Sequence, residues 1–451
     1  MSNAVILAGG SGSKMWPYNE VRNKAMLPIS NVPLIAHTVN ALLKSDINDI
    51  YIYATTFVNE IKKTFRDLKQ VHVIEIPETK GSAKTLEFHQ VRTDEPFFLF
   101  FGDCLIQETD LINFIKSDVN TALADQVRDD PKNHIILLEK ENNIDSFIGH
   151  PRGIRTGLKL FGLHLKANFL NYLTYTDSRF VNTKVGVSTP HEYFLESTLN
   201  HYLQEETIKI IQSKQPCFDL DKPWHIFEAN YYSNQVLCEA LNENILAENA
   251  TISPLARVKG YVKLGKNSII GDNVLIAGNC IIGDNTIIDN GAIIGSNTII
   301  GDNCIIRNNC KISDNCTVGN DSIVEFTAEL DGGVLFRKVY LYHHCEFYGI
   351  CGDNVDIGAG TVSGVLRFDD QNTVHQIKGR KEIPANGANA TYLGDYVRTG
   401  VNVIFQPGVM VGTNSIVGSG TILLENVPSN KLVYAKQEII EKDWGSGRYG
   451  W

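Results

Sequence analysis

An aliphatic side chain recurs at every sixth residue through much of the second half of the chain, and no other feature restricts the fold as strongly. The unbroken run comprises Ile252, Val258, Leu264, Ile270, Ile276, Ile282, Ile288, Ile294, Ile300, Ile306, Ile312, Val318 and Val324. The phase then breaks, resumes at Cys351 and Ile357, and returns as Leu393, Thr399, Phe405, Val411, Val417 and Leu423. An α-helix would show a period of about 3.6 residues. The period of six predicts a left-handed parallel β-helix, in which three hexapeptides form one triangular coil around a shared aliphatic core.

The nine cysteines form an odd-numbered set without a CxxC pair, so we expect reduced thiols rather than a disulfide framework. Four of them precede an inward-facing aliphatic residue by two positions: Cys280, Cys304, Cys310 and Cys316. A metal cluster is the alternative for the last three, which fall on successive faces of the coil. Zinc sites usually bring together closer ligand pairs. We therefore favour packing, in which a small side chain fills the corner of the coil.

Before residue 250 the chain alternates short apolar runs with amphipathic stretches, which predicts a mostly parallel, Rossmann-like α/β sheet with crossover helices. The runs AVILAGG and FFLFFGD are continuously apolar, as expected of strands covered on both faces. Ligands bind at the carboxyl ends of such strands, and these two runs end at Gly9–Gly10 and at Gly102–Asp103. The expected division is an α/β domain over 1–230, a linker helix over 231–250, a β-helix over 251–425 and a tail over 426–451.

The charge balance narrows the range of partners. The 451 residues carry 41 Lys and Arg against 51 Asp and Glu, a formal net charge of −10. An acidic surface disfavours nucleic acid and anionic lipid, although a few side chains suffice for a local phosphate pocket. No apolar run reaches the roughly 20 residues of a membrane span, and the first ten residues lack the basic and apolar regions of a secretory signal. We expect a cytoplasmic protein.

A glycine-rich turn follows the first expected strand, with Gly9, Gly10 and Gly12 within four positions. Backbone N–H groups that no Cβ shields can form a nest for phosphate oxygens. Lys14 and Lys24 would add positive charge. The segment matches neither the dinucleotide fingerprint nor the P-loop. From the residues alone, a phosphate site and an ordinary glycine turn both remain open.

Several segments, in order along the chain, resemble the sugar-1-phosphate nucleotidylyltransferases. They are LAGGSGSKMWP (7–17), NKAMLPISNVPLI (23–35), FGD (101–103), FDLDKPW (218–224) and EAN (228–230). With a hexapeptide β-helix appended, the chain resembles the bifunctional enzymes that join a uridylyl- or thymidylyltransferase to an acetyltransferase. The resemblance spans nearly the whole chain, although residues from about 105 to 215 contribute little to it.

The resemblance implies Mg²⁺-dependent transfer of a nucleotidyl group from a nucleoside triphosphate, preferably UTP or dTTP, to a sugar 1-phosphate. The attacking phosphate oxygen is already anionic, so this chemistry requires positioning and charge neutralisation rather than a strong base. By resemblance, Lys14 neutralises the leaving pyrophosphate, Lys24 holds the α-phosphate or the sugar phosphate, and Asp103 and Asp219 bind Mg²⁺. The implied nucleotide-binding positions are Leu7, Ala8, Gly9, Gly10, Ser11, Gly12, Gly81 and Ser82.

The chain departs from the family pattern in four places. Lys14 replaces an arginine, Asn23 replaces a proline, residues 74–83 lack the glutamine that reads the base, and the Glu-Lys-Pro element of the sugar site has no clear counterpart. The identities of the base and the sugar therefore stay open. A catalytically degenerate protein that binds nucleotide sugars for regulation is the first alternative to an enzyme.

The β-helix half carries segments that resemble an acetyl-CoA and amino-sugar site, namely 352–361 and 366–369. The family's histidine base aligns with Tyr342, but His343 and His344 adjoin it. A neutral imidazole is the expected base for an attacking amine. The acyl-transfer candidates are His343, His344, Asp356, Ala359 and Lys378, and a sugar acyltransferase that uses acetyl-CoA is the second alternative. Solenoids of this kind associate through their flat faces, so we expect a homo-oligomer, a trimer or a multiple of it.

Overall fold

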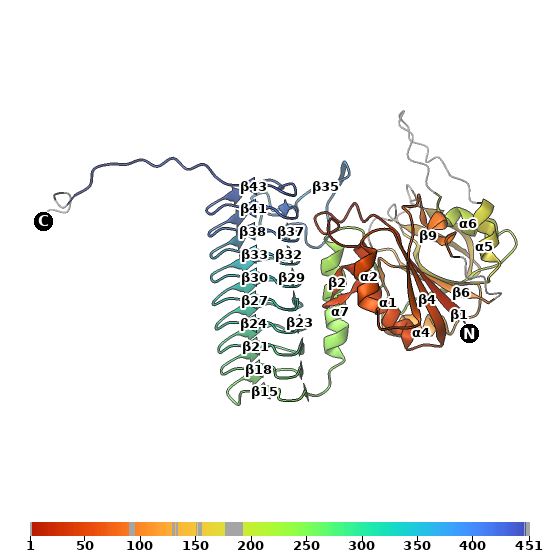
Figure 1. The fold of residues 1–451 in the computed structure, drawn as a ribbon, viewed down its shortest axis with the longest axis horizontal. Helices are drawn as coiled ribbons and strands as arrows, with labels where there is room; N and C mark the ends of the chain where they lie inside the picture. The colour runs from red at the N-terminus through yellow and green to blue at the C-terminus, as the bar shows by residue number, and fades with distance from the viewer. Residues whose placement is uncertain are drawn as a thin grey trace.

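The computed structural model describes residues 2–89, 95–128, 131, 134–149, 151, 156–175, 193–445 and 447. An α/β domain and a β-helix lie side by side, with helix α7 (His225–Glu239) between them (Figure 1). Helix α7 overlaps only the first part of the linker helix expected over 231–250, since it ends at Glu239, and the first β-helix strand begins at Ile245. In the described part of the chain, no helix combines the length and the apolar character needed to cross a membrane.

A nine-stranded sheet, in the order β5-β4-β1-β6-β11-β8-β12-β10-β9, forms the centre of the α/β domain. Its strands are β1 (Ser2–Ala8), β4 (Ile47–Ala54), β5 (Val71–Glu75), β6 (Phe97–Phe101), β8 (Thr121–Gln126), β9 (Ile135–Lys140), β10 (Asn143–Gly149), β11 (Leu158–Leu165) and β12 (Lys209–Gln212). Of these strands only β10 and β11 run against the others. The expectation of a mostly parallel α/β sheet is confirmed.

Helices cover both faces of this sheet, which explains why its first strand is apolar without alternation. The helices are α1 (Leu34–Leu43), α2 (Val58–Phe65), α3 (Ser82–Leu86), α4 (Glu108–Ile115), α5 (Phe169–Tyr172) and α6 (Leu195–Tyr202), with short 3-10 turns η1 (Lys24–Met26) and η3 (Leu173–Tyr175). Ile6 packs in the core that includes α1, α2 and α4, whereas its neighbour Leu7 packs in the core that includes α3 and α6. Strand β1 therefore contributes side chains to the cores on both faces of the sheet.

Three small antiparallel ribbons complete the loops. They are β2 (Pro28–Ile29) with β3 (Val32–Pro33), β7 (Cys104–Leu105) with β13 (Phe218–Asp219), and β35 (His375–Ile377) with β36 (Arg380–Glu382). The first two ribbons belong to the α/β domain, and the third extends from the β-helix toward it (Figure 1).

The second half of the chain is a three-sided β-helix of short parallel strands. The first face comprises β14 (Ile245–Leu246), β17 (Val262–Leu264), β20 (Cys280–Ile282), β23 (Thr298–Ile300), β26 (Thr317–Val318), β29 (Val334–Leu335), β32 (Gly349–Cys351), β37 (Thr391–Leu393) and β40 (Met410–Val411). The second comprises β15 (Thr251–Ile252), β18 (Ile269–Ile270), β21 (Ile287–Ile288), β24 (Ile305–Ile306), β27 (Ile323–Val324), β30 (Tyr340–Leu341), β33 (Asp356–Ile357), β38 (Arg398–Thr399), β41 (Ile416–Val417) and β43 (Leu432–Val433). The third comprises β16 (Arg257–Val258), β19 (Leu275–Ile276), β22 (Ile293–Ile294), β25 (Lys311–Ile312), β28 (Glu329–Leu330), β31 (Glu346–Phe347), β34 (Val362–Ser363), β39 (Ile404–Phe405) and β42 (Ile422–Leu423).

The six-residue series forms the core of this β-helix. From Leu264 to Val324 every member of the series is buried, and each coil pairs with the next at a spacing of three hexapeptides, as in Ile276 with Ile294. The four cysteines of the coil corners are buried free thiols within the same core. Within the described residues, the cysteines of the β-helix form no group with metal-binding geometry. The packing interpretation of these cysteines is confirmed.

The period continues one step beyond Val324 to the buried Leu330, which pairs with Ile312, and two short coils and an insertion explain why it breaks there. Thr317 pairs with Val334 and Val334 with Ile350, so two successive coils are shorter by one and two residues than those before them. Ile350 then pairs with Tyr392, far along the chain. The intervening segment includes the β35–β36 ribbon, which reaches the start of α7: the rings of His375 and Trp224 lie 5.2 Å apart.

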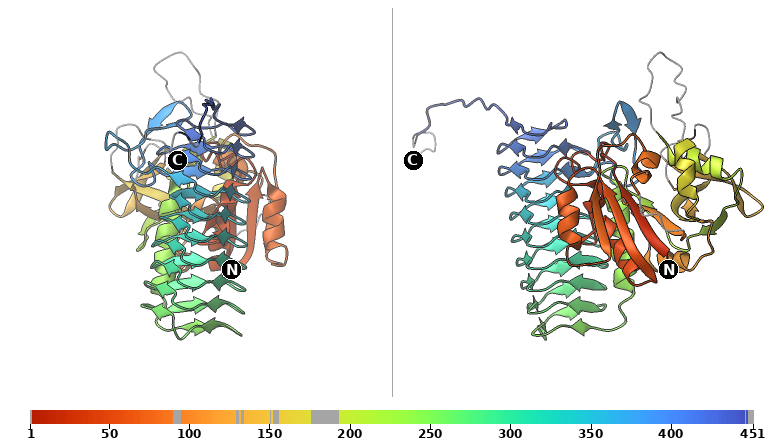
Figure 2. Two further views of the ribbon diagram at one scale, coloured as in Figure 1. Left: turned by 90° about the vertical axis from the view of Figure 1, so that its left-hand side faces the viewer. Right: turned by 45° about the vertical axis from the view of Figure 1, so that its right-hand side comes forward.

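The two domains share a hydrophobic cluster, so they pack as one body (Figure 2). Met15, Tyr18 and Trp224 of the α/β domain contribute to it together with Phe336 and Tyr392 of the β-helix. Polar contacts reinforce the junction. The Tyr18 hydroxyl donates to the carbonyl oxygen of Ile350 at 2.8 Å, and the buried Arg22 forms ion pairs with Asp395 and Asp353.

Candidate functional site

The site begins where β1 and β6 end side by side. Gly102 follows β6, and its N–H donates to the carbonyl oxygen of Leu7 at 2.8 Å. A Cβ at Gly102 would lie 3.0 Å from the Cβ of Ala8 and 3.2 Å from the Leu7 oxygen, so a larger residue would separate the strands. This close approach places Asp103 directly beside the glycine-rich turn after β1.

The β7–β13 ribbon brings Asp219 to Asp103 although the two lie more than a hundred residues apart in the sequence. Asp219 pairs with Cys104, and the N–H of Leu220 donates to the carbonyl oxygen of Asp103 at 3.0 Å. One ligand atom from each of Asp103, Cys104 and Asp219 lies within 4.8 Å of the other two. The carboxylates are therefore close enough to share one cation. Burial raises the pKa of the Cys104 thiol well above its ordinary value, which leaves the carboxylate oxygens as the charged donors.

Lys24 lies among three carboxylates. Its ammonium nitrogen is 2.8 Å from Asp103 and 3.8 Å from both Asp219 and Asp221, and its side chain is buried. Burial lowers the pKa of Lys24, but Asp103, Asp219 and Asp221 together raise it above its ordinary value. Lys14 reaches the same cluster through an ion pair of 2.8 Å with Asp221. The structure thus brings Lys14, Lys24, Asp103 and Asp219 together.

Three residues of this cluster escaped the sequence analysis: Asp221, Lys159 and His134. Lys159 on β11 and His134 lie 3.1 Å and 3.4 Å from Asp219 Oδ2. Burial acts to raise the pKa of Asp219, but Lys159, the hydrogen bond to His134 and Lys24 outweigh it and hold this pKa well below its ordinary value. Asp221 stands two residues after Asp219 in the FDLDKPW segment, so the sequence could have predicted that it lies near the site. Lys159 and His134 offered none, since only the sheet brings them here.

Asn23, which stands where the family pattern has proline, fixes the turn that carries Lys24. Its Nδ2 donates to the carbonyl oxygens of Ala8 at 3.1 Å and of Thr56 at 3.0 Å. Its Oδ1 accepts from the N–H of Ala25 at 2.9 Å. The side chain is buried with all of these contacts satisfied. These three hydrogen bonds therefore hold the turn that carries Lys24 beside the end of β1. They replace the rigidity that a proline ring would give at this position.

The predicted nucleotide-binding positions surround the same turn. Leu7 and Ala8 are buried in β1, whereas Gly9, Gly10, Ser11 and Gly12 form the partly open turn. No atom of the described residues lies within 4 Å of a Cβ built at Gly10, and the residue is exposed. Gly81, with φ of 107°, precedes Ser82 at the start of α3, and a Cβ there would overlap the backbone of Tyr193. The arrangement offers backbone donors beside a cluster of carboxylates and lysines.

The acyl-transfer candidates occupy two different places. His343 and His344 are exposed at the corner between β30 and β31, where His344 has φ of 60° and its Nδ1 lies 2.6 Å from the Thr327 hydroxyl. Asp356 and Ala359 belong to the next coil. Lys378 instead lies exposed at the turn of the β35–β36 ribbon. Within the described part of the chain, no hydrogen bond or ion pair joins its side chain to the other candidates.

Comparisons with known proteins cover both domains. The family model described as "Nucleotidyl transferase" matches residues 3–155, and the one described as "GMPPB C-terminal domain" matches residues 241–330. A bifunctional protein GlmU of Methanocaldococcus jannaschii is 28% identical over 443 residues, which covers 97% of this chain and 98% of that protein. A bifunctional protein GlmU of Methanococcus maripaludis is 30% identical over 445 residues, covering 97% and 98%.

A third relative carries a more descriptive name. The bifunctional sugar-1-phosphate nucleotidylyltransferase/acetyltransferase of Sulfurisphaera tokodaii is 25% identical over 431 residues, covering 94% of this chain and 98% of that protein. The likeness thus extends over nearly the full length of each relative, from the glycine-rich turn through the β-helix. The chain belongs to the family of the GlmU-type bifunctional proteins, and it is an enzyme of the sugar-1-phosphate nucleotidyltransferase type.

Proposed function

We propose that this protein transfers the nucleotidyl group of UTP or dTTP to a sugar 1-phosphate with the help of Mg²⁺, releasing pyrophosphate. The observation that carries the proposal is the cluster of Asp103, Asp219 and Lys24 beside the open backbone of the glycine-rich turn. The pyrimidine preference rests on the family resemblance of the sequence.

The residues present fit a hard divalent cation. Asp103 and Asp219 supply anionic oxygen donors, and the ammonium of Lys24 now lies between them, which shows that the cluster attracts positive charge. Mg²⁺ prefers such oxygens together with those of phosphate. When bound, it would neutralise charge on the phosphates of the nucleotide. Asp103 and Asp219 are the residues that would hold it.

The chain's own groups would do the remaining work. An oxygen of the sugar phosphate forms a bond to the α-phosphorus, and the bond from that phosphorus to the pyrophosphate oxygen breaks. The nucleophile is anionic, so no proton has to be removed, and the barrier lies in bringing like charges into line. Lys24 remains protonated because of its carboxylate neighbours, and it can turn its ammonium to a phosphate oxygen. Lys14, which is one-third exposed, can reach the leaving group.

The test is a matrix of nucleoside triphosphates against sugar 1-phosphates, with Mg²⁺ present and pyrophosphate release as the readout. We expect release with UTP or dTTP, and Asp103→Asn should lower kcat/KM by at least about 100-fold, as the loss of an electrostatic contact to the reacting group does in other enzymes. The control is Asp67→Asn, at an exposed carboxylate just after the end of α2. Tight binding of a nucleotide sugar without release from any pair would contradict the proposal and favour the regulatory alternative.

Acetyl transfer by the β-helix is a second candidate function, favoured by the full-length match to proteins named as bifunctional. His343 is the stronger candidate base, because the neighbouring His344 is held at the coil corner by Thr327. Thiol release from acetyl-CoA with an amino-sugar phosphate would be the readout. The activity should fall in His343→Ala and persist in His201→Ala, a histidine of α6. Release that is unaffected by His343→Ala would exclude this base.

We further propose that the protein is a homo-oligomer, in multiples of three, joined through the β-helix. The outward side chains of the second face are largely aliphatic: Ile269, Ile287, Ile305, Ile323 and Ile416. Ile269 and Ile416 are 44% and 45% exposed in the single chain. A row of aliphatic residues on a flat sheet favours association. Light scattering on the purified protein should give three chains or a multiple, and Ile269→Lys with Ile287→Lys should dissociate it.

A further inference from the structure

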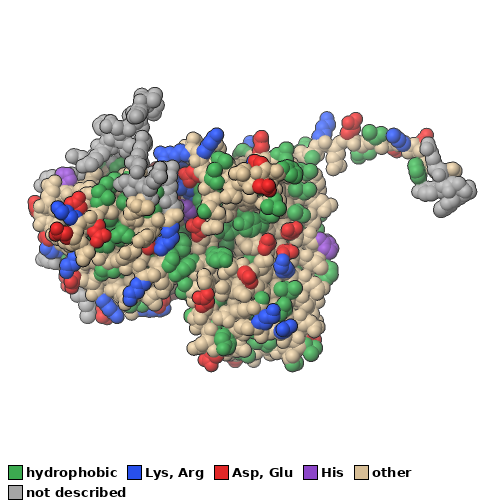
Figure 3. All heavy atoms as spheres, turned by 180° about the vertical axis from the view of Figure 1, so that it is seen from behind, with side chains coloured by type: hydrophobic (Ala, Val, Ile, Leu, Met, Phe, Trp, Pro, Cys, Tyr) green, Lys and Arg blue, Asp and Glu red, His purple; other side chains and the backbone are tan. Residues whose placement is uncertain are grey.

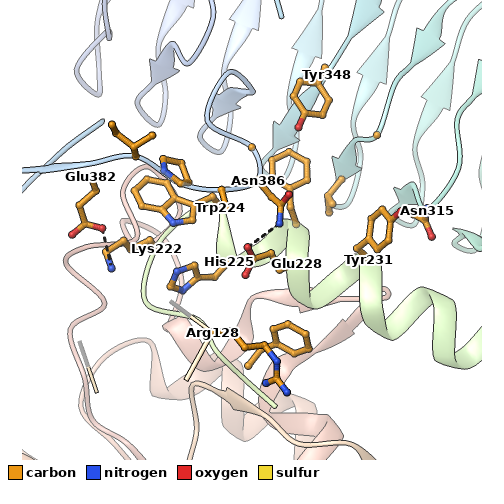
Figure 4. Close-up of a pocket in the computed structure, with 18 of the residues that line it drawn as sticks. Arg128, Lys222, Trp224, His225, Glu228, Tyr231, Asn315, Tyr348, Glu382 and Asn386 are labelled. Carbon is orange, nitrogen blue, oxygen red and sulfur yellow. Dashed lines mark hydrogen bonds and ion pairs between the residues drawn. The ribbon is translucent and has the colours of Figure 1, made fainter. Parts of the chain in front are cut away.

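A cavity of about 940 Å³ lies between the two domains, away from the glycine-rich turn (Figure 4). Helix α7 forms one wall with Phe227, Glu228 and Tyr231, and the β-helix forms the opposite wall with Asn315, which precedes β26, and Tyr348, which precedes β32. Residues 381–387 of the β-helix insertion close a third side. On the face of the molecule drawn in Figure 3, apolar side chains gather where the two domains meet. The cavity exists only because the domains pack together.

Aromatic side chains line this cavity from both domains. Phe218, Trp224, Phe227 and Tyr231 come from the α/β side, and Tyr348 comes from the β-helix. The rings of Phe227 and Tyr348 are stacked, with centroids 5.7 Å apart. Such ring faces favour a flat, conjugated ligand, because offset stacking adds to the burial of apolar surface. A volume of this size is within the usual range for small-molecule sites.

Most charged groups of the wall are already paired. Lys222 lies 3.1 Å from Glu382, Arg128 pairs with Asp125, and the amide of Asn386 donates to Glu228 at 3.1 Å. Lys381 is exposed, and the described residues supply no ion-pair partner for it. Lys381 can therefore pair with an anionic ligand.

We propose that this interdomain cavity is a second ligand site, which takes a compound with a heterocyclic ring and a phosphate group. The ring would stack on the aromatic walls, and the phosphate would pair with Lys381. Nucleotide sugars and coenzyme A both have this chemistry. The choice of nucleotide sugars as probes rests on the proposed function, whereas the site itself rests on the cavity.

The same cavity contacts the segment that carries the carboxylates of the nucleotidyl site. Phe218 lines the cavity, and the adjacent Asp219 belongs to the cation cluster. Lys222 connects the two regions, since its ammonium lies 3.1 Å from Glu382 on the cavity wall and 3.6 Å from Asp221 in the cluster. A ligand in the cavity would therefore bias the position of residues 218–222. We infer that the site is regulatory, acting on nucleotidyl transfer through this segment.

The test measures binding of UDP-glucose, dTDP-glucose and coenzyme A to the full chain by calorimetry, with the bound molecule located in a crystal structure. Ala385→Trp would fill the cavity from an exposed loop position, and Tyr231→Ala would remove an exposed part of the aromatic wall. Ala435→Trp is the matched control, at an exposed alanine of the C-terminal segment. We expect Ala385→Trp to weaken cavity binding by at least tenfold, Tyr231→Ala to weaken it less, and Ala435→Trp to leave it unchanged.

The three probes identify the source of the ligand. Binding in the cavity by a nucleotide sugar identifies a product of nucleotidyl transfer as the ligand, and binding by coenzyme A identifies the carrier of the acetyl group. Absence of all three probes from the cavity, or affinities that Ala385→Trp leaves unchanged, would overturn the proposal. Failure of the proposed function would appear separately, as absent pyrophosphate release in a protein whose cavity still binds a probe.

Discussion

In the α/β domain, Lys24, Asp103 and Asp219 come from three distant segments and meet with an ammonium nitrogen within 4 Å of both carboxylates. In the β-helix, His343, Asp356 and Ala359 come from two neighbouring coils, which stack so that the N–H of Gly360 donates to the carbonyl oxygen of His343 at 3.1 Å. The β-helix therefore brings together residues about one coil apart in the sequence, by regular stacking of one coil on the next. The α/β domain gathers charged groups through crossings of the chain, at the edge where its strands end.

In the β-helix, unlike in the α/β domain, the repeat alone predicts which side chains face the core and which face solvent. Ile294→Ala should lower the free energy of unfolding by about 2–5 kcal/mol, since its side chain is fully buried. Ile293→Ala, its neighbour at 42% exposure, is the matched control and should change it by less than about 0.5 kcal/mol. Urea unfolding of both variants measures the effect. Equal losses would mean that the period does not determine orientation.

The long-range character of the nucleotidyl cluster can be tested through Lys159. Burial raises the pKa of the Asp219 carboxyl, and the positive charge of Lys159 lowers it. Lys159→Met removes that charge, so the pKa of Asp219 should rise from its depressed value. The site requires the ionised carboxylate, so the acid limb of kcat/KM should move to higher pH. The pH profile of pyrophosphate release measures this shift. Lys166→Met, which removes an ion pair with Glu206 outside the cluster, should leave the profile in place.

The smallest effect is expected at Lys14, where the family pattern has arginine. Lys14→Arg keeps the charge and adds a planar fork that can bind a phosphate in two places. Because the ion pair with Asp221 is partly exposed, it is worth about 0.2–1 kcal/mol, and kcat/KM should stay within about fivefold of the wild type or rise. A complete loss of pyrophosphate release would show that the turn is shaped for lysine alone.

The predictability of the candidate site from the sequence differed from residue to residue. The motif order along the chain brought out Lys14, Lys24, Asp103 and Asp219, and the structure places them together. Lys159 stands in β11 with nothing around it to distinguish it from a surface lysine, and only its place in the sheet directs it to Asp219. Asn23 was read as a departure from the pattern, but its three hydrogen bonds show that it replaces the proline by a different means.

The sequence by itself determined the β-helix, because each of its core side chains follows from a local period and each coil repeats the last. It also determined the alternation of strands and helices, in which helices cover both faces of the sheet that contains β1. The meeting of Asp219 with Lys159 and His134, and the cavity between α7 and the insertion, were decided only by tertiary structure. The physical reason is that these contacts join residues far apart in the chain, whose approach depends on the packing of whole domains and leaves no periodic mark in the sequence.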